Sequence, residues 1–140
     1  MAVTSQRGLA GSGINRFTGK ALIGWPHVVQ CLGVIFTTNF GERVMREGFG
    51  SLVPVVLGRN MTPREILPFW QAIWTSIDTF EPRYKVTSVQ PIDLDRLGNL
   101  NLLIQGQYRP RGHLGDFTVE GAKRVRFGAT DTNTGRVEAL

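Results

Sequence analysis

The sequence predicts an α+β domain in which two main helices pack on a small three-stranded antiparallel sheet. In two segments before Pro82, apolar residues recur every three or four positions, a spacing that is typical of amphipathic helices. After Pro82 the apolar period changes to two, which is typical of strands that bury one face. We therefore expect the helices to precede the strands in one domain.

The length and composition fit one folded unit with two irregular ends. The chain has 140 residues, 41% of them hydrophobic, with 17 Gly and 7 Pro, which indicates a single loop-rich domain. We expect a flexible N-terminal arm over residues 1–25, because five glycines and scattered single hydrophobes give it no period. The folded domain is predicted over 26–127 and a C-terminal tail over 128–140.

The first helix is predicted over about residues 26–38. Pro26 suits the first helical position, and Gly33 lies inside the helix at a cost of about 1 kcal/mol relative to alanine. The residues expected on its apolar face are Val28, Leu32, Ile35 and Phe36. Glycines and prolines then punctuate residues 41–61, where we expect a connection with one short helical turn near 51–57.

The second helix is predicted to start at Thr62-Pro63-Arg64-Glu65, which has the form of a capping box. Pro68 removes one backbone donor, so we expect a kink or a restart there. Pro82 ends the segment, because the residue before a proline is pushed out of the helical region. Its apolar stripe comprises Ile66, Leu67, Trp70, Ile73, Trp74 and Ile77.

Three runs with a period of two follow the helices. The first two, over 84–89 and 100–108, flank a turn at 95–99 and predict an antiparallel hairpin. A weaker third strand is expected over 117–127. Its inward positions are Phe117, Val119, Gly121, Lys123 and Val125. Glycine and lysine on an inward face favour an edge strand, which a partner can extend.

The charge is distributed unevenly along the chain. Sixteen basic against eleven acidic residues give +5, yet residues 28–108 are neutral, and 1–27 and 109–127 each carry +3. A basic protein suggests a nucleic-acid partner as an alternative, but basic and aromatic residues do not interleave as in a stacking platform. We therefore expect no nucleic acid, and instead expect the basic ends to dock on acidic surfaces of neighbouring subunits.

The residues do not favour an enzyme, and we expect no catalytic residues, cofactor, metal or small-molecule substrate. His27, Cys31 and His113 do not supply metal-ligand spacing, and a buried thiol is favoured over a nucleophilic one. A lysozyme-like hydrolase remains as the weaker alternative, but arginines near most of the acids lower carboxyl pKa values, whereas a general acid needs a raised pKa. The uncharged stretch 21–41 contains too many polar residues for a membrane span.

The triplet Glu81-Pro82-Arg83 is the most unusual local feature. Pro82 forces Glu81 into extended geometry, so the two charged side chains project to the same side, about 6 to 7 Å apart. Two interpretations stay open. The charges pair locally at a helix-to-strand corner, or the corner presents them to a partner, where arginine makes strong two-pronged contacts.

Several motifs in a fixed order resemble those of a known family. They are Trp25-Pro26-His27-Val28-Val29-Gln30, Gly41-Glu42-Arg43-Val44-Met45-Arg46, Phe49-Gly50-Ser51, Glu81-Pro82-Arg83, and Gly98 in the hairpin turn. Over about residues 13–108 the chain resembles the small baseplate wedge proteins of contractile phage tails, sometimes labelled lysozyme-like and related to the small baseplate subunit of type VI secretion systems. Phe80 and Tyr84 depart from the residues common in that family.

The resemblance implies a non-enzymatic virion protein with a sheath-like handshake domain. Its implied partners are the helical core bundle of the larger wedge subunits, the first ring of tail sheath protein, and the tail tube or hub, with six copies in a ring. It also implies assembly in the host cytoplasm. Glu81, Pro82 and Arg83 match the family's expected contact with the wedge core, and Gly41 and Arg43 match a second motif. The small sheet is expected to accept strands from sheath arms.

Overall fold

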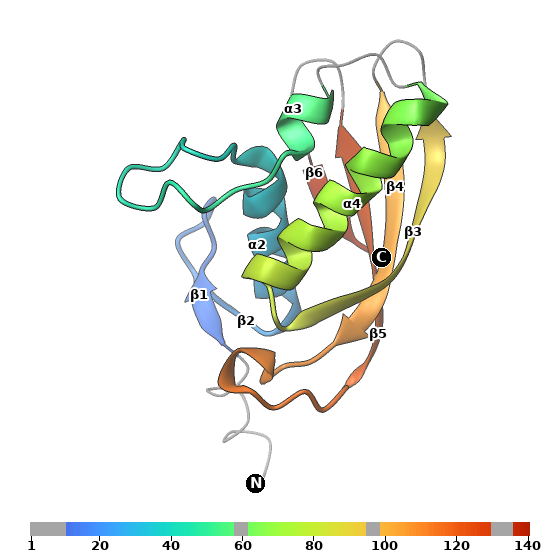
Figure 1. The fold of residues 1–140 in the computed structure, drawn as a ribbon. Coiled ribbons are helices and arrows are strands. Elements are labelled where there is room, and N and C mark those ends of the chain that lie inside the picture. The colour runs from blue at the N-terminus through green and yellow to red at the C-terminus, as the bar shows by residue number, and fades with distance from the viewer. Residues whose placement is uncertain (1–10, 58–61, 95–98, 130–135) are drawn as a thin grey trace, which may run out of the picture.

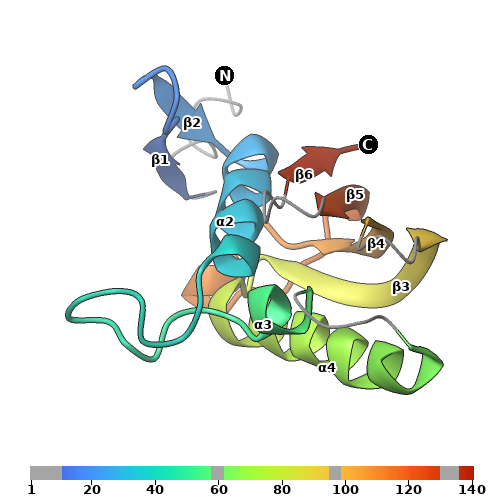
Figure 2. The same ribbon diagram turned by 90° about the horizontal axis from the view of Figure 1, so that it is seen from above.

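The computed structural model describes residues 11–57, 62–94, 99–129 and 136–140 (Figure 1). The helices are α2 (Trp25–Thr37), α3 (Val53–Leu57) and α4 (Pro63–Phe80), with a short 3-10 helix at Gly112–Leu114. The strands are β1 (Ser12–Ile14), β2 (Ala21–Ile23), β3 (Tyr84–Leu94), β4 (Leu100–Tyr108), β5 (Gly121–Ala129) and β6 (Arg136–Ala139). The helices pack against one face of a curved sheet (Figure 2).

The predicted three-stranded sheet was wrong, although the broad α+β class fits. The main sheet has four antiparallel strands in the order β3-β4-β5-β6, and β1 pairs with β2 in a separate two-stranded sheet. The extra strands fall in the segments expected to be an arm and a tail. They are three or four residues long, which is too short for an alternating pattern to be visible.

The turn between β1 and β2 explains how residues 12–23 are ordered. The Asn15 side chain accepts the backbone N–H groups of Phe17 at 2.9 Å and Thr18 at 3.1 Å, an arrangement that stabilises tight turns. Gly19 adopts φ +69°, which glycine reaches without strain. Local hydrogen bonds therefore stabilise this hairpin, although its sequence has no hydrophobic period.

The predicted apolar face of α2 is confirmed. Val28, Leu32, Ile35 and Phe36 of α2 are all buried, and α3 lies on the predicted helical turn. In α4 the prediction was right only in part, because Ile73 and Ile77 are buried but Leu67 and Trp74 are 67% and 37% exposed, and Phe69 is buried instead. Helix α4 runs continuously through Pro68, without the restart that the sequence left open. The predicted cap residue Thr62 forms no side-chain hydrogen bond with the start of the helix. Packing of Phe69, Ile73 and Ile77 into the core outweighs the backbone bond lost at the proline.

The predicted edge strand over 117–127 was wrong in part. The strand starts at Gly121, so Phe117 and Val119 lie before it. Val125 pairs with Ala139 of β6, so β5 is flanked on both sides there. Gly121 and Lys123 pair with β4 and lie outside the β6 register within the described residues. Because only Val137 of β6 is partly buried, the sequence offers no pattern from which that covering strand could be predicted.

An aromatic cluster joins the start of α2 to the sheet. The Trp25 ring lies 5.3 Å from Tyr84 and 5.4 Å from Tyr108, measured between centroids. The ring of Tyr84 packs where a side chain on Gly106 would be, and its hydroxyl lies 3.2 Å from the Ile104 carbonyl. The glycine at position 106 is thus a packing requirement of the sheet.

We predict that substitution by alanine has opposite effects on stability at Gly33 and at Gly106. In α2, a Cβ at Gly33 would meet Val137 at 3.8 Å, an ordinary contact, so Gly33→Ala should raise the free energy of unfolding by about 0.5 to 1 kcal/mol. At Gly106 the Cβ would lie 2.5 Å from the Lys85 carbonyl, so Gly106→Ala should lower it by about 1 to 3 kcal/mol. Urea denaturation measures both, and a destabilised Gly33→Ala variant would contradict the described α2–β6 packing.

Candidate functional site

The corner between α4 and β3 holds two buried charges beneath an exposed proline. The Glu81 N–H donates to the Ile77 carbonyl at 2.8 Å and closes the helix, and the Tyr84 N–H donates to the Glu81 carbonyl at 3.1 Å. The side chains of Glu81 and Arg83 are 3% and 8% exposed, whereas Pro82 is exposed. The corner therefore turns the ring of Pro82 outward and both charges inward.

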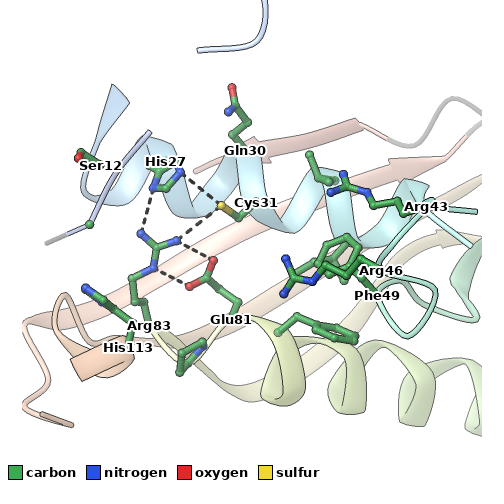
Figure 3. A pocket seen from close by; sticks show the side chains of 15 residues that line it. Ser12, His27, Gln30, Cys31, Arg43, Arg46, Phe49, Glu81, Arg83 and His113 are labelled. Atoms are coloured by element: carbon green, nitrogen blue, oxygen red, sulfur yellow. Dashed lines mark hydrogen bonds and ion pairs between the residues drawn. The ribbon is translucent and has the colours of Figure 1, made fainter. Parts of the chain in front are cut away.

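The Arg83 guanidinium connects this corner to α2 (Figure 3). Its Nε and Nη2 donate to the two carboxylate oxygens of Glu81 at 2.6 and 2.8 Å. Nη1 lies 3.0 Å from Nδ1 of His27, and Nη2 lies 3.5 Å from Sγ of Cys31. The local pairing left open by the sequence is thus present, and it is reinforced by a helix more than fifty positions away.

The surroundings of the ion pair shift three pKa values. Burial, followed by the Arg83 charge, lowers the pKa of His27 below 6.5. Burial, followed by the Glu81 charge, raises the pKa of Cys31, so its sulfur is a thiol at neutral pH. Burial opposes the charge on Arg83, but hydrogen bonding and attraction from Glu81 outweigh it and raise the Arg83 pKa. The cluster favours a fixed guanidinium and a protonated thiol rather than a thiolate nucleophile.

A cavity of about 530 Å³ opens beside the cluster. Arg43, Arg46 and Phe49 line its far side, between α2 and the end of α4 (Figure 3). The predicted residue Arg43 therefore faces the same cavity as Glu81, Pro82 and Arg83. Gly41 lies in the same connection with φ +80° but does not line the cavity.

The remaining predicted residues lie elsewhere. Phe117 and Val119 are 59% and 43% exposed beside the start of β5, and Gly121 and Lys123 follow in the strand itself. Arg46, Phe49, His27 and Cys31 were not predicted to lie at the cavity. Arg46, Phe49 and His27 had a signal in the resembling motifs, but no local pattern connects His27 or Cys31 with Arg83.

Across residues 11–57, 62–94, 99–129 and 136–140, no three His, Cys, Asp or Glu side chains gather as a metal ion would require. In the same part of the chain, none of the helices combines the length and apolarity needed to cross a membrane.

Comparison with known proteins gives consistent matches. The family model of baseplate wedge protein gp25 matches residues 26–111. Baseplate protein W of Escherichia phage P2 is 30% identical over 108 residues, which cover 76% of this chain and 92% of that protein. A chain in the postcontracted baseplate of pyocin R2 superimposes with a TM-score of 0.62 at 25% identity, covering 71% of this chain and 99% of that chain.

We predict that Arg83→Ala destabilises the fold. It leaves the Glu81 carboxylate buried without its partner, so the free energy of unfolding should fall by about 3 to 5 kcal/mol. Arg64→Ala, at an exposed position of α4, is the matched control and should change stability by less than about 0.5 kcal/mol. Chemical denaturation of both variants measures the difference, and equal stabilities would show that the buried pair contributes nothing.

A second prediction concerns pH. Because the pKa of His27 is lower in the folded chain than 6.5, the unfolded chain binds its proton first as pH falls. The contribution of His27 to stability is therefore complete above pH 6.5 and is lost as pH falls below that value. Thermal denaturation between neutral and mildly acidic pH should show a shallower loss for His27→Gln than for the wild type, and identical slopes would refute the assignment.

Proposed function

The chain belongs to the family of baseplate wedge protein gp25, and we propose that it joins the helical core bundle of the larger wedge subunits and initiates polymerisation of the tail sheath by strand exchange. The family match covers both the exposed Pro82 corner and the connection that carries Arg43. The observation that carries the proposal is this corner, where a buried ion pair holds an exposed turn in a fixed position beside an open cavity.

The wedge-facing surface in this proposal consists of Glu81, Pro82, Arg83, Gly41 and Arg43. Three of them, Pro82, Gly41 and Arg43, are exposed and available for direct contact. Glu81 and Arg83 are buried, so their part is to hold the corner rigid, and a partner meets Pro82 before it meets the guanidinium. A rigid surface loses less conformational entropy on assembly than a flexible one.

The sheath-facing surface is proposed at the start of β5. Gly121 and Lys123 lie beyond the part of β5 that β6 covers, and the exposed Phe117 and Val119 precede them. An arm of the first sheath ring would add there as a strand, with backbone hydrogen bonds giving affinity and alternate side chains giving specificity. Val125, which β6 pairs, lies at the limit of this edge.

The proposal places the chain in the tail baseplate of the virion after assembly in the host cytoplasm. Six copies would form a ring, with the tail tube or hub as a further neighbour. The wedge domain covers residues 26–127 and is flanked by residues 1–25 and 128–140. The basic segments, residues 1–27 and 109–127, would dock on acidic surfaces of these neighbours. In this proposal the chain is a structural and non-enzymatic subunit.

Aspartates at the proposed sheath edge test the function. The double variant Phe117→Asp, Val119→Asp should fold, because both side chains are exposed, yet charge at a strand edge opposes strand addition. Electron microscopy of particles should then show tubes with baseplates that contain the chain and lack sheath. Leu67→Asp, at a 67% exposed position of α4, is the control and should give sheathed tails. Normal sheaths with both variants would contradict strand addition at this edge.

A further inference from the structure

The connection between α2 and α3 projects from the body and has a defined shape (Figures 1 and 2). At its base the Ser51 N–H donates to the Thr38 carbonyl at 2.9 Å, and further out the Gly41 N–H donates to the Glu47 carbonyl at 2.8 Å. The Glu42 carboxylate accepts the Asn39 N–H at 2.7 Å. The first two bonds cross the connection from one side to the other and the third closes a turn at its start, so its backbone has a defined shape beside the cavity.

Two arginines of this connection share one aromatic ring. The Cζ atoms of Arg43 and Arg46 lie 4.6 and 4.9 Å from the centroid of Phe49, within the range of cation–π attraction. Phe49 in turn packs against Phe80 at the end of α4, with 4.9 Å between ring centroids. Figure 3 shows Arg43, Arg46 and Phe49 on the opposite side of the cavity from Arg83.

These arginines differ from Arg83 in how their charge is balanced. Arg83 is neutralised by Glu81. Among the ion pairs that the described residues form, none includes Arg43 or Arg46, and the nearby Glu42 carboxylate is bonded to a backbone N–H. Two exposed like charges held on one ring repel each other. A carboxylate brought from outside would relieve that repulsion and gain charge-assisted hydrogen bonds.

Apolar surface accompanies the two charges. Val34, Ile35 and Phe80 line the cavity together with the arginines and the buried ion pair. Outside it, Val44 and Met45 lie between the arginines in the chain and are 90% and 99% exposed. Met45 also adopts φ +66°, the only positive φ of a residue other than glycine in the described part of the chain. Exposed apolar residues in a held conformation are typical of binding surfaces.

We infer that the cavity bounded by Arg43, Arg46 and Phe49 binds an acidic segment of a neighbouring wedge subunit. Carboxylates of that segment bind the two guanidiniums, and an apolar side chain between them enters the cavity. The inference rests on the proposed function for the identity of the neighbour, but the chemistry of the ligand follows from the cavity alone. A carboxylate peptide fits better than a nucleic acid, because the apolar side chains of Val34, Ile35 and Phe80 are part of the cavity lining beside the two cations.

Peptide titration tests the chemistry without the neighbour. The isotopically labelled protein is titrated with a short peptide of alternating Glu and Leu, with its Lys and Leu counterpart, and with a short DNA duplex. The acidic peptide should shift the amide signals of Arg43, Arg46 and Phe49 in a saturable way. Each of Arg43→Glu and Arg46→Glu should lower the affinity for the acidic peptide about tenfold. Shifts caused by the duplex alone, or by the acidic peptide at other residues only, would overturn the inference.

Co-purification with the wedge subunits separates this inference from the proposed function. The wild-type chain should co-purify with them and should dissociate as salt is raised, whereas Arg43→Glu, Arg46→Glu should be lost even at low salt. Arg64→Glu is the matched control, since it reverses an exposed charge at the distant start of α4. If wild type and double variant are retained equally, the inference fails and the proposed function stands. If the wild type does not co-purify, the wedge function fails, and the peptide titration still decides the inference.

Discussion

The arrangement of this protein depends on one buried ion pair. Glu81 ends α4, Arg83 begins the turn into β3, and the guanidinium of Arg83 reaches His27 and Cys31 of α2. Removing two charges from water is costly, so the pair is tolerated only when every donor and acceptor has a partner. That requirement fixes the relative positions of a helix end, a strand start and a second helix.

The arginines around the cavity differ in how their charges are paired. Arg83 is neutralised inside the protein and gives the corner its shape, and this leaves Pro82 as the exposed part of the triplet. Arg43 and Arg46 lie on Phe49 with no ion pair among the described residues. In our proposal, recognition of a charged partner therefore falls to Arg43 and Arg46, whose charges form no ion pair within the described residues.

What the sequence could predict depended on how long each pattern runs. The faces of α2 and α4 and the alternation of β4 extend over nine or more residues, long enough for a period to be read. The strands β1, β2 and β6 have at most four residues each, and their pairing depends on turn hydrogen bonds and on Val137 against α2. The spacing of Glu81 and Arg83 predicted a shared side, but the partners His27 and Cys31 lie over fifty positions away, beyond the reach of any local pattern.

In our proposal, the face formed by the Pro82 corner and the Arg43–Arg46 connection meets the wedge. An electron cryomicroscopy map of the assembled tail that contains this chain would show this contact. We expect helical wedge density against Pro82, acidic side chains beside both arginines, and an undisturbed Glu81–Arg83 pair beneath them. A map in which this face borders only solvent, while the wedge subunits contact the opposite face of the sheet, would contradict the proposal.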